Sequence, residues 1–196
     1  FYPDTAKNVV KVLNAADVDV EYNPEQTCCG KFAFNSGFVD EAKELGEKFL
    51  RDFPNDRPIV GVSASCVGYI KKRYEELFYN TASHLEYKRL VRNIFEFTDF
   101  LVNKINIMNF GAEFNHKVVY QDTCCSLREL GLKDEGRKLL SNVKGIEILE
   151  MKYHEVCCGF GGGFFSIQHE AISVAMAERK IKDAMSVGAE YIVTND

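Results

Sequence analysis

The stretch that decides the fold is Pro58-Ile59-Val60-Gly61-Val62, which runs straight into Ser63-Ala64-Ser65-Cys66. The first five residues form a short apolar run with β-branched members, which is typical of a strand buried on both faces. Apolar residues recur at helical spacing before it, over 42–53, and after it, over 69–78. A strand between two helices belongs to a parallel sheet, and here it delivers a cysteine to the carboxyl edge of that sheet.

The same alternation of strands and helices continues along the chain. In the first half we expect a helix over 5–16 capped by Asp4, a strand over 18–22, and helical structure over 84–108. In the second half we expect strands over 118–120, 146–149 and 191–193, and helices over 126–140 and 165–187. The pattern predicts an α/β fold class, with two halves that are each a small, mainly parallel sheet flanked by helices.

A vicinal cysteine pair followed by glycine occurs twice, as Cys28-Cys29-Gly30 and as Cys157-Cys158-Gly159. The offset of 129 residues between the copies indicates an internal, pseudo-two-fold duplication. We place the first repeat at 1–110 and the second at 111–196, with the boundary at 109–115. The same offset maps Cys124 to a position five residues before Phe1, and Cys66 to position 195. We therefore expect an N-terminal strand and cysteine of the first repeat upstream of Phe1, and the last cysteine of the second repeat beyond Asp196.

Composition excludes several classes of partner. The chain has 24 Lys and Arg against 29 Asp and Glu, a net charge of −5, and no basic block, so no nucleic acid is expected to bind. No apolar run reaches the length of a transmembrane segment. Seven cysteines gathered in short motifs make a poor disulfide framework and favour a reducing, cytoplasmic location.

The spacing of the thiols favours bound metal. Adjacent cysteines form strained disulfides, and several thiolates gathered together need a zinc ion or an iron–sulfur cluster to neutralise their charge. Gly30 and the glycines of 159–163 can point backbone N–H groups at sulfur. The glycines within 159–163 do not complete the G-x-G-x-x-G motif of dinucleotide-binding loops. Three classes remain open: an iron–sulfur redox subunit, a zinc-stabilised scaffold, and a thiol–disulfide oxidoreductase, although the Cys-x-x-Cys spacing usual for the last is absent.

The doubled motif resembles the cysteine-rich CCG domain family of iron–sulfur subunits, and within it the lactate utilization proteins. The resemblance covers the whole chain and depends on these segments: 26–30 (QTCCG), 35–37 (NSG), 97–100 (FTDF), 130–133 (LGLK) and 157–162 (CCGFGG). It implies an iron–sulfur electron-transfer subunit of an L-lactate-oxidising complex, with the other subunits of that complex as partners. The alternative is a zinc-bound scaffold subunit of an oxidoreductase complex.

The resemblance also implies a ligand set and assigns no catalytic residue. Carried over position by position, the metal and cofactor ligands fall on Cys28, Cys29 and Cys66 in the first repeat, and on Cys124, Cys157 and Cys158 in the second. These would hold a cluster of the 4Fe–4S type, cubane or noncubane. The first repeat departs from the fuller Cys-x-x-Cys pattern because Ser63 replaces one thiol, which puts a five-cysteine noncubane cluster in doubt.

Four other residues near the motifs have open roles. Cys125 has no counterpart in the first copy, and we expect a buried small side chain rather than a ligand. His154 is expected to be a partly exposed polar residue before the loop, with proton carrier or ligand as the alternative. His169 could face the site or the solvent. Asp122 is expected to cap the helix that follows it.

Overall fold

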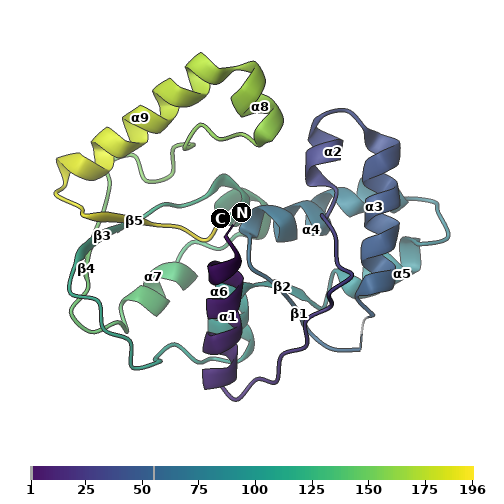
Figure 1. Cartoon of the computed structure of the whole chain (residues 1–196), viewed down its shortest axis with the longest axis horizontal. Helices are drawn as coiled ribbons and strands as arrows, with labels where there is room; N and C mark the ends of the chain where they lie inside the picture. The colour runs from purple at the N-terminus through teal and green to yellow at the C-terminus, as the bar shows by residue number, and fades with distance from the viewer. Residues whose placement is uncertain (1, 55) are drawn as a thin grey trace.

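Two small parallel sheets form the centre of the molecule in the computed structural model, which describes residues 2–54 and 56–196 (Figure 1). The first sheet pairs β1 (Ile59–Gly61) with β2 (Ile94–Glu96), with Ile59 opposite Ile94. The second has the order β4 (Glu147–Leu149), β3 (Lys117–Tyr120), β5 (Tyr191–Val193), so that β3 is central. Helices flank both sheets. The expected α/β fold with two small parallel sheets is therefore confirmed.

The first sheet is surrounded by α1 (Pro3–Ala15), α2 (Lys31–Asn35), α3 (Val39–Asp52), α4 (Ala64–Phe78) and α5 (His84–Leu90). Helix α4 supplies the largest buried side chains of this half, among them Tyr69, Tyr74 and Phe78. The Tyr74 ring meets the rings of Tyr69 and Phe78 edge-on, with centroids 5.5 and 5.3 Å apart. The Tyr74 hydroxyl donates to the carbonyl oxygen of Cys29 at 2.8 Å. This buried contact fixes the backbone of the first vicinal cysteine pair against the core.

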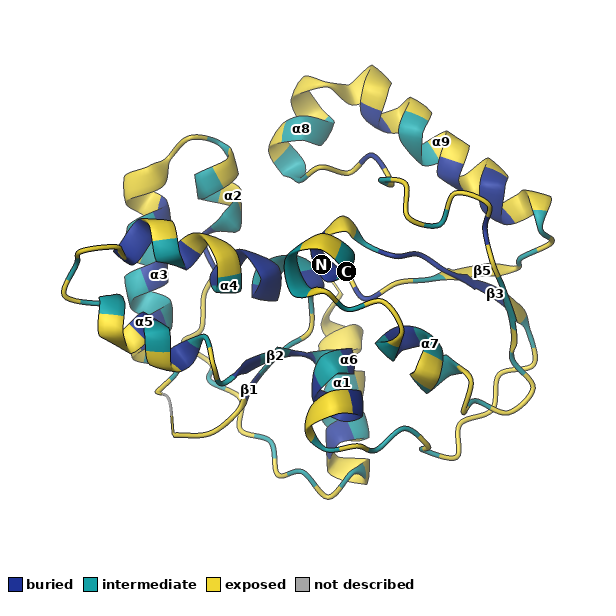
Figure 2. Ribbon diagram, turned by 180° about the vertical axis from the view of Figure 1, so that it is seen from behind, coloured by how far each residue is buried: buried dark blue, intermediate teal, exposed yellow. Residues whose placement is uncertain are grey.

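The remaining helical segments are α6 (Phe97–Asp99), the π-helix η1 (Phe100–Lys104), the π-helix η2 (Cys125–Leu130), α7 (Glu135–Leu140), α8 (Gly163–Gln168) and α9 (Glu170–Ser186). Val118 and Val119 in β3 are fully buried. Figure 2 shows that β3 is buried while much of α9 is exposed on its outer side. Among the described residues, no helix combines the length and the apolar character needed to cross a membrane.

Several expected elements differ from the structure. Residues 18–22 are irregular rather than a strand, and in the described chain their backbone pairs with no strand. The helical stretch expected over 84–108 is interrupted by β2, because the residues of β2 pair with β1. Gly131, at a φ of 73°, ends η2 and divides the helix expected over 126–140. His169 separates α8 from α9.

The first helix also begins differently from expectation. Pro3 occupies its first position, where a missing N–H costs nothing, and Asp4 lies in its first turn without capping it. A carboxylate in the first turn still interacts favourably with the positive end of the helix dipole.

Candidate functional site

The first group of cysteines, Cys28, Cys29 and Cys66, comes from a loop and from the start of a helix. Cys28 and Cys29 precede α2, and Cys66 lies in the first turn of α4. Gly30 has a φ of 89°, which favours glycine, and its N–H donates to Sγ of Cys28 at 3.4 Å. The thiol of Cys29 is buried and interacts with the thiols of both Cys28 and Cys66. The structure thus places the three predicted ligands of the first repeat near one another, although in the described residues they are not arranged to hold a metal ion.

The three thiols differ in acidity because Cys29 interacts with the other two. The interaction with Cys29 is the largest influence on Cys28 and, with the N–H of Gly30, lowers the pKa of Cys28 to about 5 against the effect of burial. The interaction with Cys29 also lowers the pKa of Cys66, with help from Ser63. The pKa of Cys29 is raised by its interactions with Cys28 and Cys66 and by burial. At neutral pH, Cys28 is therefore biased toward the thiolate, which is the form that binds metal, and the lowered pKa of Cys66 acts in the same direction.

Ser63, which stands where the fuller motif has a thiol, acts as the N-cap of α4. Its hydroxyl accepts the N–H of Cys66 at 3.4 Å and also bonds the carboxylate of Asp196. The N–H of Ser65 donates to the same carboxylate at 3.1 Å, and the N–H of Ala64 donates to the carbonyl of Asn195 at 3.1 Å. The residues after β5 thus hold the start of the helix that carries Cys66.

The second vicinal pair repeats the local geometry of the first. Gly159 has a φ of 93°, and its N–H donates to Sγ of Cys157 at 3.4 Å. The carbonyl of Gly159 accepts the hydroxyl of Ser173 on α9 at 2.8 Å. In both copies the glycine after the cysteines directs an N–H at sulfur. The prediction is therefore confirmed for Gly30 and Gly159, and stays a prediction for the other glycines of 159–163.

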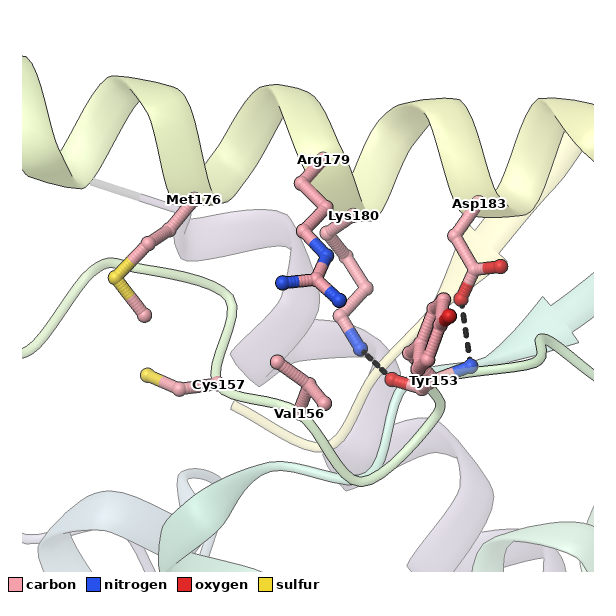
Figure 3. A pocket seen from close by; sticks show the side chains of 7 residues that line it. All are labelled: Tyr153, Val156, Cys157, Met176, Arg179, Lys180 and Asp183. Carbon is pink, nitrogen blue, oxygen red and sulfur yellow. Dashed lines mark hydrogen bonds between the residues drawn. The ribbon is translucent and has the colours of Figure 1, made fainter.

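Helix α9 also fixes the loop that leads to this pair. Lys180 donates to the carbonyl of Tyr153 at 2.6 Å, and the Asp183 carboxylate accepts the N–H of Tyr153 at 2.8 Å (Figure 3). In Figure 3 the thiol of Cys157 faces the side chain of Met176 across a small cavity of about 70 Å³. The loop is therefore held from one side by charged groups of α9.

Lys31, the first residue of α2, connects the two repeats and was not identified from the sequence. Its ammonium group donates to Sγ of Cys125 at 3.1 Å and to the carbonyl of Ser65 at 3.2 Å. Sγ of Cys125 is 4.0 Å from Sγ of Cys124. Cys125 is only 6% exposed, so the expectation of a buried side chain is confirmed. The positive charge of Lys31 helps to lower the pKa of Cys124.

The segments that follow the two vicinal cysteine pairs, α2 in the first repeat and the start of α8 in the second, lie close to each other. A Cβ added to Gly163 would lie 2.9 Å from the Phe32 ring, and one added to Gly162 would lie 3.4 Å from the amide nitrogen of Asn35. Helix α2 therefore packs close to α8. Within residues 2–54 and 56–196, however, no three His, Cys, Asp or Glu side chains are arranged to hold a metal ion. No hydrogen bond of the described chain joins Cys124 to either cysteine of the second pair.

Asp122 does not cap a helix, which corrects the sequence prediction. Its side chain is 1% exposed and accepts two hydrogen bonds from Arg137 and one from Nδ1 of His154, all at 2.8 Å. The hydroxyl of Thr123, instead, accepts the N–H of Ser126 at 3.2 Å. His154 is partly exposed, as expected, and is oriented by the buried carboxylate. This network holds the loop before the second pair against β3.

Comparison with known proteins agrees with the doubled pattern. The sequence model of the CCG cysteine-rich domain matches residues 1–71 and 118–196. The chain is also 35% identical to lactate utilization protein A 2 of Bacillus cereus, across all of this chain and 81% of the relative. It is 37% identical to lactate utilization protein A of Oceanobacillus iheyensis, across all of this chain and 80% of that relative.

The chain belongs to the CCG cysteine-rich domain family. The two matched segments fall one in each half of the CCG protein. The repeat boundary at 109–115 stays a prediction.

The donor set of this CCG protein fits a thiolate-bound metal or cluster. Soft sulfur donors are present in both repeats, and in the first repeat interactions of Cys29 lower the pKa of Cys28 and Cys66. In each repeat a glycine N–H points at a cysteine sulfur, which is how proteins stabilise charge on cluster sulfurs. A cluster would be held by Cys28, Cys29 and Cys66, together with Cys124, Cys157 and Cys158.

We expect Gly159→Ala to destabilise this CCG protein more than Gly37→Ala. Both glycines have a similar φ, 93° and 86°, so both substitutions force a side chain into the left-handed region. A Cβ at 159 would also lie 2.5 Å from the carbonyl oxygen of Ser173, whereas a Cβ at 37 meets nothing within 4 Å. Urea unfolding should show a difference of about 1–3 kcal/mol between the two variants. Equal losses would contradict the close packing of α9 on the second pair.

We expect Cys125→Ala to slow the alkylation of Cys124 several-fold at pH 7. The hydrogen bond from Cys125 is the main reason that the pKa of Cys124 is lowered to about 6, and Lys31 adds a smaller effect. Without that donor the pKa rises and the thiolate fraction falls. Mass spectrometry of metal-free protein treated with iodoacetamide measures the rate at Cys124. Lys31→Gln should slow it less, and an unchanged rate in both variants would contradict this assignment.

Proposed function

We propose that this chain is an iron–sulfur electron-transfer subunit in lactate utilization, belonging to a complex that oxidises L-lactate to pyruvate. The observation that carries the proposal is the gathering of Cys28, Cys29 and Cys66. The names of the relatives, lactate utilization protein A, indicate the metabolic role. A bound cluster of the 4Fe–4S type would supply one-electron transfer at a potential set by its surroundings.

The residues of the chain contribute ligands and electrostatic stabilisation. Six thiols are available as ligands, and the N–H groups of Gly30 and Gly159 reduce the negative charge on sulfur. The ammonium group of Lys31 donates to Sγ of Cys125 and to the carbonyl of Ser65, which precedes Cys66, and its charge would favour a more negative, reduced centre nearby. The arrangement supports electron transfer.

The remaining parts of the proposal concern partners and location. Electrons must come from lactate or from a subunit that binds it, so we propose the other subunits of a lactate-oxidising complex as partners. Seven free thiols fit a reducing compartment, and we place the protein in the cytoplasm.

The deciding experiment is the analysis of full-length protein purified without oxygen. Brown protein that contains iron and acid-labile sulfide in comparable amounts, with an electron paramagnetic resonance signal after reduction, would support the proposal. Colourless protein with stoichiometric zinc would contradict it and would favour the zinc scaffold.

A further inference from the structure

Tyr69 of α4 has a buried hydroxyl group that makes no hydrogen bond within the described chain. The residue is 2% exposed, and its hydroxyl oxygen has no partner among the described residues. Two other tyrosines of the same core are satisfied. The hydroxyl of Tyr74 donates to the carbonyl of Cys29 at 2.8 Å, and that of Tyr87 donates to the carbonyl of Lys71 at 3.2 Å. Because a buried donor without an acceptor is unfavourable, the hydroxyl of Tyr69 is available to a group that the polypeptide does not supply.

The ring of Tyr69 lies between side chains that adjoin the first group of cysteines. Its centroid is 5.5 Å from that of Phe34 on α2, the helix that follows the first vicinal pair. It is also 5.5 Å from the ring of Tyr74, whose hydroxyl holds the carbonyl of Cys29. Cys29 belongs to the same cluster of buried side chains, and Cys66 packs against that cluster. Tyr69 is therefore part of the core on which these cysteines rest.

Helix geometry directs the hydroxyl of Tyr69 toward the cysteines. Tyr69 follows Cys66 by three residues within α4, and residues at this spacing are neighbours on one face of a helix. Aromatic side chains in helices point back toward the N-terminus, over the residues three and four positions earlier. The electrostatics agree, because burial is the largest cause of the raised pKa of Tyr69 and the charges of Cys29 and Cys28 come next. Both arguments place the hydroxyl on the side of α4 where the thiols lie.

The alternative acceptor for this hydroxyl fits less well. The carboxylate of Glu76 affects the pKa of Tyr69 less than either cysteine does. The Glu76 side chain is 53% exposed and pairs with Arg73, so it lies in solvent with a partner of its own. In the described chain none of the thiols accepts the hydroxyl either. The donor is therefore left for a sulfur atom of a group bound at the thiols.

We propose that the hydroxyl of Tyr69 donates a hydrogen bond to a sulfur of an iron–sulfur centre held at Cys28, Cys29 and Cys66, and thereby raises its reduction potential. The inference rests on the proposed function, because only a bound centre supplies the acceptor. Hydrogen bonds to cluster sulfurs are one of the means by which proteins set the potential. Reduction adds negative charge to the centre, so a donor stabilises the reduced state more than the oxidised state.

Tyr69→Phe tests the proposal, because it removes the hydroxyl and keeps the ring. In full-length protein purified without oxygen, the variant should contain as much iron and acid-labile sulfide as the parent. A redox titration followed by electron paramagnetic resonance should give a potential lower by about 30 mV or more, which is about a threefold change in the equilibrium constant for a one-electron reduction. An unchanged or higher potential would overturn the proposal.

The matched control for the potential is Tyr87→Phe. It removes a hydroxyl from the same core, but one whose acceptor is the carbonyl of Lys71 rather than a group at the thiols. The potential of this variant should equal that of the parent. A shift as large as that of Tyr69→Phe would show that any loss of a core hydroxyl changes the potential, and would overturn the proposal.

The stability of metal-free protein separates this role from a structural one. Removing an unpartnered hydroxyl breaks no hydrogen bond, so metal-free Tyr69→Phe should melt no lower than the metal-free parent. Tyr74→Phe loses the bond to the carbonyl of Cys29 and should melt lower. A lower melting temperature in Tyr69→Phe would show that the hydroxyl has a partner within the polypeptide, and would overturn the proposal.

A measurement without any change at Tyr69 covers the case in which Tyr69→Phe does not fold. Protein made with tyrosine deuterated next to the hydroxyl should show deuterium coupling in electron–nuclear double resonance spectra of the reduced centre, and Tyr74→Phe should retain it. Absence of the coupling from the parent, or its loss in Tyr74→Phe, would overturn the proposal. Absence of iron from the parent would overturn the proposed function as well, whereas iron with an unchanged potential in Tyr69→Phe would overturn this inference alone.

Discussion

Anaerobically purified Cys28→Ala and Cys158→Ala proteins are expected to contain little or no iron and acid-labile sulfide, whereas Cys125→Ala protein is expected to keep both. The expectation follows from the proposed iron–sulfur function, because thiolates are the ligands that hold such clusters. Cys28 and Cys158 are exposed, so removing their sulfur atoms opens no cavity in the core. Loss of metal in these variants would therefore report a lost ligand. Cys125 is buried and its sulfur accepts a hydrogen bond from Lys31, as expected for a packing residue.

Iron and sulfide per polypeptide, with electron paramagnetic resonance of the reduced protein, measure this effect. Thermal unfolding of the metal-free variants is the control, because all three should then melt close to the parent protein or, for Cys125→Ala, slightly below it. Equal losses of iron in all three variants would show that the ligand set is wrong. Retention of iron in Cys28→Ala would show that Cys28 of the first repeat does not hold a cluster.

The fold could be predicted where the residue types themselves indicate a buried strand. Apolar β-branched runs identified β1, β3, β4 and β5. Strand β2 was missed because residues 94–96 lie among apolar residues at helical spacing, and only pairing with β1, 35 residues away, makes them a strand. The opposite error occurred at residues 18–22, whose composition favours a strand but whose backbone has no neighbouring strand in the described chain. Local sequence contains no information on which partners are available.

The candidate site also has features that could be predicted from local sequence and features that depend on distant residues. The vicinal cysteines and their glycines were identified because the chemistry of thiols and the freedom of glycine belong to the residues themselves. Lys31 was missed because its role depends on Cys125, 94 residues later. Asp122 was misread because an acid before a helix commonly caps it, whereas here Arg137 competes more strongly for the carboxylate. Long-range ion pairs of this kind cannot be inferred from a single sequence.

Arg137→Ala is expected to destabilise the fold by about 3–5 kcal/mol, because it leaves a buried carboxylate without its main partner. Arg137 holds Asp122 with two hydrogen bonds of 2.8 Å and Glu150 with two of 2.7 and 3.0 Å. Its guanidinium group also lies over the Tyr120 ring, 5.0 Å from the centroid. The Asp122 side chain is 1% exposed, so water cannot replace the lost donors. For a chain of this size the melting temperature should fall by about 10 °C.

The matched control is Lys133→Ala, which breaks the pair between Lys133 and Glu155. Both of these side chains are about half exposed, at 53% and 48%, and solvent screening leaves such pairs with little effect on stability. A similar small loss in Arg137→Ala would show that the Asp122 pair is not structural.

The pH dependence of the loss in Arg137→Ala identifies its cause. Burial alone would raise the pKa of Asp122, but hydrogen bonds from Arg137 and His154 lower it below its usual value of 3.8. A carboxylate with a lowered pKa stabilises the fold above its unfolded-state pKa, and this stabilisation is lost as the pH falls through the folded-state pKa. The difference in unfolding free energy between the parent protein and Arg137→Ala should therefore be largest above about pH 5 and shrink toward pH 2. A difference that stayed constant over this range would indicate that packing of the arginine on Tyr120, rather than its charge, stabilises the second sheet.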